Sequence, residues 1–519
     1  MADTKREIER KFEFPASDGA RPRLPGLTAV PGIAEAADQG IVELDAVYYD
    51  TRDLRLDADS LTLRRRTGGA DAGWHLKVPV SAGIRDEIRA PLSDDPPRPL
   101  LALLRSRVRG GALVPVVRLR SSRDVRHLLA EDGALVAELS IDTVRAEGLR
   151  EGSSSTDWTE IEVELADGIH DETVLDRIGE VFAEAGILPS TSASKVARAL
   201  RETAPDKRPG PTGRAPGPAL ADGTAGAHVL GYLRTQRDAI VALDPAVRRE
   251  LPDSVHRMRV ATRRLRSAFT SYAKVVDRAV TDPVGDELKW LAAELGVDRD
   301  REVLTHRLRS HLKAVPRTLQ LGPVRARLRI WSATRSAGTR RRILAALDGE
   351  RYLALLDTLD ALLAAPPLRP AAARPAAEVL PKAVLKDYRR LAGRIATALD
   401  LDPGRDRDVA LHQARKAAKR ARYAAEAAAP ALGTPAKKIT KRLKAVQNAL
   451  GDHQDSVVAR ETLRLLAAQA HAAGESAFTW GLLYGREEAT AARRERDLPG
   501  LWARAAQAKL RRRLRAAGA

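Results

Sequence analysis

The first part of the chain alternates polar and apolar residues in short runs. Because successive side chains leave opposite faces of a strand, this alternation predicts β-strands with one charged and one apolar face. The clearest runs are residues 7–14 (EIERKFEF), 61–66 (LTLRRR), 75–80 (HLKVPV), 116–120 (VVRLR), 137–144 (AELSIDTV) and 158–165 (WTEIEVEL). Residues 171–187 space their apolar side chains as an amphipathic helix does. The pattern predicts an antiparallel sheet that can close into a barrel.

The second part of the chain follows a different period. It is rich in Ala, Leu and Arg, and its apolar residues recur at spacings of three and four, which predicts helices throughout. A Pro/Gly-rich segment without apolar periodicity, residues 204–223, predicts a linker. We therefore expect an α+β multidomain protein with a β domain at 1–203 and an all-α domain at 224–519.

The helical part repeats itself. Residues 256–269 (HRMRVATRRLRSAF) resemble 412–425 (HQARKAAKRARYAA), and 290–304 resemble 445–459. The offset is 156 residues from His256 to His412 and 155 from Gly296 to Gly451. Two matching blocks in the same order predict an internal duplication. A Pro-rich break at 364–378 would separate two similar bundles, at about 224–363 and 379–519.

Charge divides the chain at the same place. Residues 1–220 carry 31 basic and 37 acidic residues, a net of −6, whereas the remainder carries 57 and 32, a net of +25. A strongly basic domain attracts polyanions such as nucleic acid, anionic membranes or phosphate polymers. Aromatic residues make up only 4% of the chain, so few platforms exist for stacking single-stranded bases. Nucleic acid is thus disfavoured but stays an alternative.

Composition excludes several other classes. The chain has no cysteine, so disulfides, thiolate nucleophiles and sulfur-ligated zinc are ruled out. Its first residues are charged where a signal peptide would be apolar, and no long apolar run predicts a membrane span. No Gly-Lys pair occurs, which excludes a P-loop. We expect a soluble, cytoplasmic protein.

Many charged residues of the predicted strands share one face. The acidic ones are Glu7, Glu9, Glu138, Asp142, Glu160, Glu162 and Glu164, and the basic ones are Lys11, Arg64, Arg66, Lys77, Arg85, Arg89, Arg118 and Arg120. On an open sheet these charges would be a solvated face. In a closed barrel they would point into one lumen, where they must pair or meet a ligand. Carboxylates there suit Mg²⁺ or Mn²⁺, and arginine and lysine suit phosphate oxygens.

The helical repeat carries a basic stripe in each copy. His256, Arg259, Arg263 and Arg266 are spaced at i, i+3, i+7 and i+10, as are His412, Arg415, Lys419 and Arg422. Lys289 and Lys444 also match at the 155-residue offset. A single stripe would be read as a solvated helix face. Because like charges on one helix repel one another, a stripe present in both copies favours an anion-binding surface.

The β domain resembles the CYTH domain, the triphosphate tunnel metalloenzymes. The resemblance rests on E-x-E-x-K at residues 7–11 with LRRR at 63–66, LKVP at 76–79, ELSID at 138–142, EIEVEL at 160–165 and SKVARAL at 194–200, and it covers about residues 4–203. It implies an eight-stranded antiparallel tunnel that holds a triphosphate with a divalent metal. The family includes adenylate cyclases and thiamine-triphosphatases, so the motif leaves the leaving group open.

The resemblance also implies roles for single residues. Metal binding is implied for Glu7, Glu9, Asp142, Glu160 and Glu162. Phosphate binding is implied for Lys11, Arg64, Arg66, Lys77, Arg85, Arg118, Arg120 and Lys195. Glu7, Glu9, Lys11 and Glu162 would be catalytic. The register of the Arg-rich stretch 105–126 is open, with Arg123 as the alternative to Arg118 in the lumen.

The helical domain resembles the CHAD domain, the conserved-histidine α-helical domain, over about residues 224–512. The resemblance rests on HRMRVATRRLR, LGVDRDREV, HQARKAAKRARYAAE and LKAVQNALGDHQDSV. It implies inorganic polyphosphate bound in a groove between the two bundles. The implied contacts are His256, Arg259, Arg263, Arg266, Lys289, His412, Arg415, Lys419, Arg422 and Lys444.

Three functions are open on these grounds. In the first, the tunnel hydrolyses triphosphate or short polyphosphate with Mg²⁺ or Mn²⁺, and the helical domain concentrates the polymer or docks the protein on polyphosphate granules. In the second, both domains bind the polymer without catalysis. A nucleic-acid binder is a third, supported only by net charge.

Overall fold

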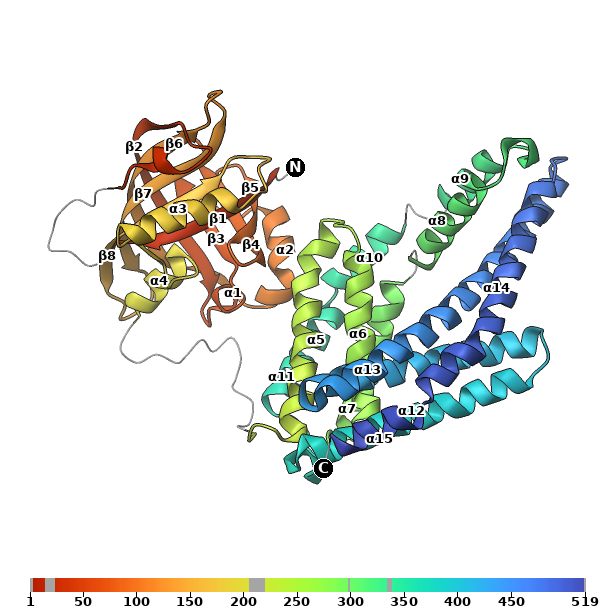
Figure 1. The fold of residues 1–519 in the computed structure, drawn as a ribbon. Coiled ribbons are helices and arrows are strands. Elements are labelled where there is room, and N and C mark those ends of the chain that lie inside the picture. Colours follow the sequence, from red (N-terminus) through yellow and green to blue (C-terminus); the bar gives the residue numbers. More distant parts are fainter. Residues whose placement is uncertain (1–2, 15–23, 205–219, 297–298, 334–337, 518–519) are drawn as a thin grey trace. The chain divides into compact units, whose positions relative to one another are not determined.

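A computed structural model describes residues 3–14, 24–204, 220–296, 299–333 and 338–517 (Figure 1). The chain divides into two compact units, residues 1–215 and 216–519. Most of the predicted linker, residues 205–219, lies outside the described residues, so the predicted domain boundaries stay a prediction. Each unit is described separately below.

The first unit is a closed antiparallel barrel, as predicted (Figure 1). Around it the strand order is β5-β4-β3-β2-β6-β7-β8-β1, and β1 also pairs with β5, which closes the ring. Its eight strands are β1 (Asp3–Glu13), β2 (Glu35–Thr51), β3 (Thr62–Thr67), β4 (Gly73–Ser81), β5 (Ile84–Ala90), β6 (Leu113–Leu129), β7 (Leu135–Gly148) and β8 (Ser155–Leu165). A two-residue strand, β9 (Leu188–Pro189), extends the pairing of β1.

Short helices cover the outer face of the barrel, where the apolar side of the strands packs. Phe12 of β1 meets Phe182 of α3 (Thr173–Glu184) edge to face, with ring centroids 4.9 Å apart. Leu76 of β4 packs with Leu100 and Leu104 of α2 (Arg98–Val108), beside the single turn α1 (Arg55–Ala58). The 3₁₀ turn η1 (Leu27–Ala29) lies over a separate part of the wall. The apolar residues are therefore outside and the charged rows inside, the reverse of a soluble sheet with a solvated face.

One end of the lumen is apolar. There the inward rows of β6, β7 and β8 change from charged residues to Leu119, Val144 and Trp158. These side chains pack with Val196 and Leu200 of α4 (Lys195–Glu202), the helix after β9, whose N-terminus is capped by the Ser194 hydroxyl. The buried cluster closes this end of the lumen.

The sequence pattern missed the long strand β2. Its inward residues Val42, Leu44, Ala46 and Tyr48 are mostly apolar, whereas Asp45 faces outward. Residues 42–46 (VELDA) do alternate, but their apolar side chains face inward, so β2 carries no inward row of charges like those of the other strands.

The second unit is helical, as predicted. Its first half contains α5 (Ala225–Arg248), α6 (Ser254–Ser271), α7 (Arg278–Glu294), α8 (Arg299–Lys313), α9 (Val324–Ala333), α10 (Thr339–Asp348) and α11 (Glu350–Ala364), with the 3₁₀ turn η2 (Arg317–Leu319). After the 3₁₀ turn η3 (Pro370–Ala373), its second half contains α12 (Ala376–Asp400), α13 (Arg405–Ala472), α14 (Phe478–Ala505) and α15 (Ala508–Ala516).

The two copies of the sequence repeat lie in helices that Figure 1 labels α6 and α13. α5 and α6 in the first half correspond to α12 and the start of α13 in the second. α13 breaks at Gly433, whose φ of 58° is left-handed, and its second segment corresponds to α7 and α8. One large core joins both halves, and a separate core lies among α8, α9, the end of α13 and α14. No helix in the described part of the chain has a stretch apolar enough to cross a lipid bilayer.

Candidate functional site

The barrel encloses a cavity of about 490 Å³ with a charged wall. The predicted residues that line it are Glu7, Glu9, Lys11, Arg64, Arg66, Lys77, Arg85, Glu162 and Lys195. Further charged residues in the same wall are Lys5, Asp71, Glu87, Arg89, Arg123, Glu138, Glu164 and Asp167. Closure of the sheet thus brings residues from distant parts of the sequence around one space.

The candidate ligand carboxylates lie on β1 and β8. Only 3% of Glu7 and 6% of Glu9 is exposed. The strand register sets Glu162 opposite Lys11, whose ammonium contacts it and lies 3.4 Å from Glu9 Oε1. Lys77 Nζ lies 2.6 Å from Glu7 Oε2. Each of the three carboxylates therefore has a lysine as its counter-ion.

The carboxylates differ in their affinity for a proton. Burial raises the pKa of Glu7, despite the positive charge of Lys77. Burial also opposes ionisation of Glu162, but Lys11 and Lys195 outweigh it and hold the pKa of Glu162 well below its usual value. Glu162 is therefore a permanent anion, and Glu7 is the carboxylate better able to accept a proton.

The wall also holds cations close to one another. Burial and the positive charges of Arg64 and Arg123 lower the pKa of Arg66 to about 9. An arginine does not lose its proton in a protein, so this shift marks the cost of burying the guanidinium, to which repulsion from its two cationic neighbours adds. A bound polyanion would relieve that repulsion.

Glu87 of β5 is a site residue that sequence reasoning missed. It is fully buried, accepts a hydrogen bond from Arg89 Nε, and lies 3.4 Å from Arg64 Nη2 and 3.8 Å from Lys77 Nζ. Its Oε1 is also 2.9 Å from His75 Nδ1. The signal was present, because Glu87 lies between Arg85 and Arg89 on the alternating face.

The His75–Glu87 pair makes the stability of the barrel sensitive to acid. Burial lowers the pKa of His75 to about 4, below the value of about 6.5 expected in the unfolded chain. The unfolded state therefore binds more protons between these values, so this pair should make stability rise with pH across that window, by up to about 1.4 kcal/mol per unit. In His75→Gln that rise should be smaller.

Urea unfolding followed by tryptophan fluorescence between pH 4 and 7 measures the effect. His170→Gln, at an exposed position, is the control. An unchanged pH dependence in His75→Gln would contradict the assignment of a neutral, buried His75.

The prediction that Arg118 and Arg120 face the lumen is wrong. Arg118 Nη2 is 2.5 Å from Asp45 Oδ2 on the outer face, and 54% of the Arg120 side chain is exposed. The inward row of β6 instead contains Leu119 and, four residues later, Arg123. Because the lumen is apolar at its closed end, the charged residues there must point outward, and the alternative of Arg123 in the lumen is the one realised.

Two predicted metal ligands do not line the cavity. Asp142 is fully buried and pairs with Arg123 Nη2 at 2.8 Å and Lys195 Nζ at 3.0 Å. Glu160 Oε1 lies 2.8 Å from Lys195, and its Oε2 accepts a hydrogen bond from Trp158 Nε1. Neither carboxylate lines the cavity, and their ion pairs hold Lys195 and Arg123 in place.

The remaining donors fit a hard divalent cation. Glu7, Glu9 and Glu162 present carboxylate oxygens to one cavity, and Mg²⁺ and Mn²⁺ prefer such ligands. Lys11 and Lys77 compensate these charges in the structure. Glu162 also pairs with Lys195 Nζ at 2.6 Å and Arg123 Nη2 at 3.0 Å, so a cation would have to compete with several ion pairs for these oxygens.

The basic stripes of the helical unit lie on α6 and on the start of α13. A Cβ on Gly296 would meet Arg259 Nη2 at 2.8 Å, and one on Gly451 would lie 3.7 Å from Arg415 Nε. The duplicated glycines therefore face the duplicated arginines and leave space for them. Because Arg259 and Arg415 are half-buried in this way, the stripes are not simply a solvated helix face.

The other predicted contacts vary in their surroundings. Lys289 and Lys444 are exposed, and His256 is exposed at the start of α6. Arg422 Nε donates to Gln447 Oε1 at 2.7 Å, which joins the two segments of α13. Burial and the nearby lysine and arginine charges lower the pKa of His412, so its ring is neutral at pH 7. Arg263, Arg266 and Lys419 are half-buried on the same helices.

A histidine with two carboxylates was not anticipated from the sequence. Nε2 of the buried His453 lies 3.3 Å from Asp408 Oδ1 and 3.0 Å from Glu495 Oε1. Arg460 lies 3.2 Å from Asp408, and Arg407 lies 3.0 Å from Glu495. The two guanidiniums balance the two carboxylates, which fits an ion-pair network that joins α13 to α14.

Comparisons with known proteins find a matching domain family for each unit. The CYTH domain family matches residues 5–200, and the CHAD domain family matches residues 231–464. The uncharacterized protein Rv2226 of Mycobacterium tuberculosis (strain ATCC 25618 / H37Rv) is 39% identical over 508 residues, which covers 95% of this chain and 94% of that protein.

Two similar solved structures each cover a little over half of this chain. PptA from Streptomyces chartreusis is 22% identical with a TM-score of 0.46, covering 54% of this chain and 99% of its own. The CHAD domain from the plant Ricinus communis is 28% identical with a TM-score of 0.43, covering 56% of this chain and 95% of its own. From the two family matches and the full-length relative, the chain belongs to the family of proteins in which a CYTH domain is followed by a CHAD domain.

Proposed function

We propose that the CYTH unit hydrolyses inorganic triphosphate, or the ends of short polyphosphate chains, with Mg²⁺ or Mn²⁺. The observation that carries this proposal is the cavity wall, in which carboxylates such as Glu7 and Glu9 face the same space as Arg64, Arg66 and Lys195. A triphosphate is a compact polyanion that needs several cations at once, and its cleavage needs charge stabilisation. An uncharged substrate would make no use of these charged groups.

The chain's own residues supply most of the chemistry. A divalent ion, when bound, would supply positive charge that stabilises the phosphate during attack by water. Glu7, Glu9 and Glu162 would hold that ion, and Glu7 would also orient the water and accept its proton, because burial raises its pKa. The arginine and lysine side chains opposite them would neutralise the charge that develops on the phosphate oxygens.

The closed end of the lumen supports attack on chain ends. The apolar cluster that includes Leu119, Trp158 and Leu200 leaves no charged path through that end. A polyphosphate chain would therefore enter from the open end and present its terminal phosphates to the carboxylates. This supports inorganic triphosphate and short chains as substrates.

We further propose that the CHAD unit binds inorganic polyphosphate along its two stripes and docks the protein on polyphosphate granules. Support comes from the repeated placement of Arg259 and Arg415 against glycines on equivalent helices. A thin, flexible polyanion can follow half-buried arginines more closely than a wide duplex can. Binding should therefore withstand duplex DNA at equal phosphate concentration.

Phosphate release from tripolyphosphate by the full chain, with and without Mn²⁺, tests the catalytic part. We expect release that requires the metal and stops with a chelator. If polyphosphate binds but no phosphate is released under any metal condition, the protein is a non-catalytic polyphosphate-binding module. Displacement of polyphosphate by duplex DNA would instead favour a nucleic-acid binder.

The position of β6 side chains gives a sharper test of the tunnel. Arg123→Gln should lower metal-dependent hydrolysis by about a hundredfold, because it removes a guanidinium from the cavity wall and leaves Asp142 with one partner fewer. Arg118→Gln combined with Arg120→Gln should change it less than about twofold, since both side chains face outward. Initial rates of phosphate release at saturating metal measure the activity of both variants, and circular dichroism checks that both are folded. The opposite ranking would contradict the register seen here.

A further inference from the structure

We propose that Asp71 is a built-in competitor for phosphate: its carboxylate pairs with the guanidinium of Arg66, and a phosphate that binds Arg66 must displace it. Asp71 lies in the loop at residues 68–72, which joins β3 to β4. Gly69, Ala70 and Asp71 of this loop line the cavity. The inference rests on the proposed binding of triphosphate by this cavity and adds a residue that sets the affinity for it.

The carboxylate of Asp71 contacts two arginines of the cavity wall. It forms an ion pair with Arg66, and its Oδ2 lies 3.9 Å from Arg89 Nη2. Only 7% of the Arg66 side chain is exposed, whereas 32% of the Asp71 side chain is exposed. Asp71 is thus the member of the pair that an anion entering from solvent reaches first.

The guanidinium of Arg66 can accept a better partner than Asp71. Its Nε is buried and has no hydrogen-bond acceptor among the described residues. Repulsion from Arg64 and Arg123 adds to the cost of burying its charge. A phosphate group presents more acceptor oxygens and more negative charge than a carboxylate, and its geometry suits the fork of N–H donors on a guanidinium. A phosphate of the substrate can therefore replace the carboxylate.

The loop backbone is held in place, so the carboxylate can leave by rotation of its own side chain. The carbonyl oxygen of Asp71 lies 2.9 Å from Nε2 of the buried His75. Gly68 has a φ of 81°, and a Cβ there would meet the carbonyl oxygen of Glu43 at 2.1 Å. Only glycine fits such a close approach with this backbone conformation. Displacement of the carboxylate therefore needs no movement of the loop.

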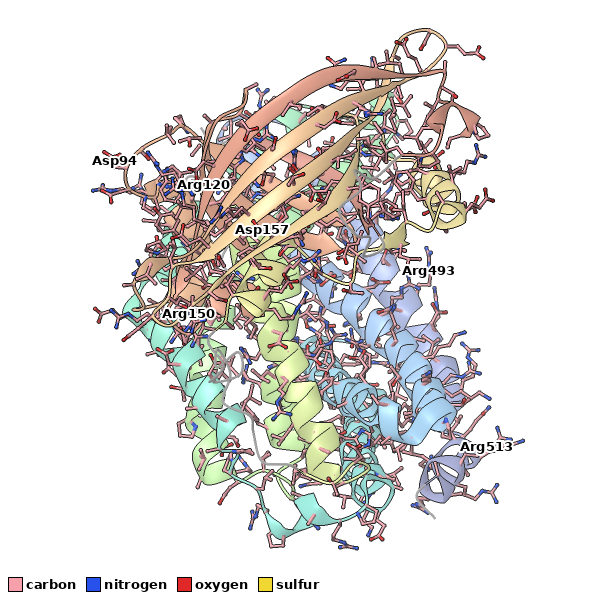
Figure 2. The ribbon with its side chains drawn as sticks, turned by 90° about the vertical axis from the view of Figure 1, so that its left-hand side faces the viewer. Asp94, Arg120, Arg150, Asp157, Arg493 and Arg513 are labelled. Atoms are coloured by element: carbon pink, nitrogen blue, oxygen red, sulfur yellow. The ribbon has the colours of Figure 1, made fainter. Side chains whose placement is uncertain are left out.

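The preceding residue of β3 has an aspartate partner outside the cavity. Arg65 Nη2 lies 3.9 Å from Asp94 Oδ1 on the outer face of the barrel. Asp94 is fully exposed, and Figure 2 shows it pointing away from the barrel. Water screens such a pair, so it contributes little. The Arg66–Asp71 pair has the same residue types but faces the cavity, which makes Asp94 a matched position for a control.

The test is the affinity for tripolyphosphate of Asp71→Asn in the full-length chain. Asparagine keeps the size of the side chain and removes its charge, so a phosphate no longer competes with an ion pair for Arg66. We expect binding to become about fivefold tighter. Because the carboxylate is displaced alike in the bound and transition states, the KM for hydrolysis should fall by the same factor and kcat should stay within about twofold.

Affinity is measured by titration calorimetry with a chelator present, so that hydrolysis does not interfere. Both the reference chain and the variant then carry four further changes, which remove binding by the stripes of the helical unit: Arg259, Arg263, Arg415 and Lys419 each to Glu. The KM is measured without these four changes, because hydrolysis reports on the tunnel alone.

Two control variants share the loss of one negative charge. Asp94→Asn removes it from the outer face, and Asp167→Asn removes it from the cavity wall, where Asp167 Oδ1 lies 3.4 Å from Lys5 Nζ. Both should change the affinity by less than about twofold, since both side chains are exposed and screened by water. Asp71→Glu restores the carboxylate and should bind nearer to the wild type than Asp71→Asn does. Circular dichroism should be the same for all variants.

The outcomes separate this inference from the proposed function. An affinity of Asp71→Asn equal to that of Asp167→Asn would overturn the competition, and weaker binding would make Asp71 a residue that positions Arg66. In an Arg66→Gln background the effect of Asp71→Asn should be less than about twofold, so a full fivefold gain there would also overturn the proposal. A wild type that binds tripolyphosphate and releases no phosphate contradicts only the proposed hydrolysis, because calorimetry still measures the effect of Asp71. A tunnel that binds no tripolyphosphate contradicts both.

Discussion

Changing Glu7 and Glu9 together to Gln should lower metal-dependent release of phosphate from tripolyphosphate by about a thousandfold or more. Both carboxylates are buried in the cavity wall, and glutamine keeps their size while removing the charge that a divalent ion needs. Because burial already raises the pKa of Glu7, a neutral residue there should be tolerated by the fold. At Glu9 burial opposes ionisation, but Lys11 outweighs it and lowers the pKa, so a neutral residue there should cost some stability, and circular dichroism must show that the variant is folded.

The matched control is Glu43→Gln with Glu147→Gln, at exposed positions on the outer face of the barrel. It should keep the wild-type rate. Polyphosphate binding by the helical unit should be equal in all three proteins, since that unit has its own core. Full activity in the Glu7/Glu9 variant would refute the assignment of the cavity as the active site.

Reversing the charge of the two stripes should weaken polyphosphate binding by about a hundredfold or more. The variant changes Arg259, Arg263, Arg415 and Lys419 each to Glu. Each lost contact should also reduce counterion release, so the log–log dependence of affinity on salt should become flatter by up to about 3 units, taking about 0.7 per contact. Isothermal titration at several salt concentrations measures both quantities.

The control for charge changes Arg309, Lys313, Arg317 and Arg329, at exposed positions around α8 and α9, each to Glu. It shares the change in net charge, so a general electrostatic effect would weaken both proteins equally. Unchanged helix content is required, because Arg259 and Arg415 pack against glycines. If the folded stripe variant keeps the affinity and salt dependence of the wild type, the stripes are not the binding surface.

The sequence by itself determined which residues can share a face. Alternation in residues 7–14 and 158–165 predicted charged rows, and the prediction is confirmed because the period of a strand is local and does not depend on the partner strand. The helical duplication was also readable, since an offset of 155 or 156 residues survives in the primary sequence. Both inferences used only spacing along the chain.

The tertiary structure decided which of these rows face the cavity. Whether Arg118 or Arg123 points inward depends on where the lumen becomes apolar, and α4 sets that boundary with residues some seventy positions away along the chain. Glu87 became a site residue only when β5 met β1 and closed the barrel. Asp142 does not line the cavity, because it pairs with Arg123 of β6 and Lys195 of α4. A strand's pattern specifies two faces, but only the closed sheet specifies which is inside and which charges there are already paired.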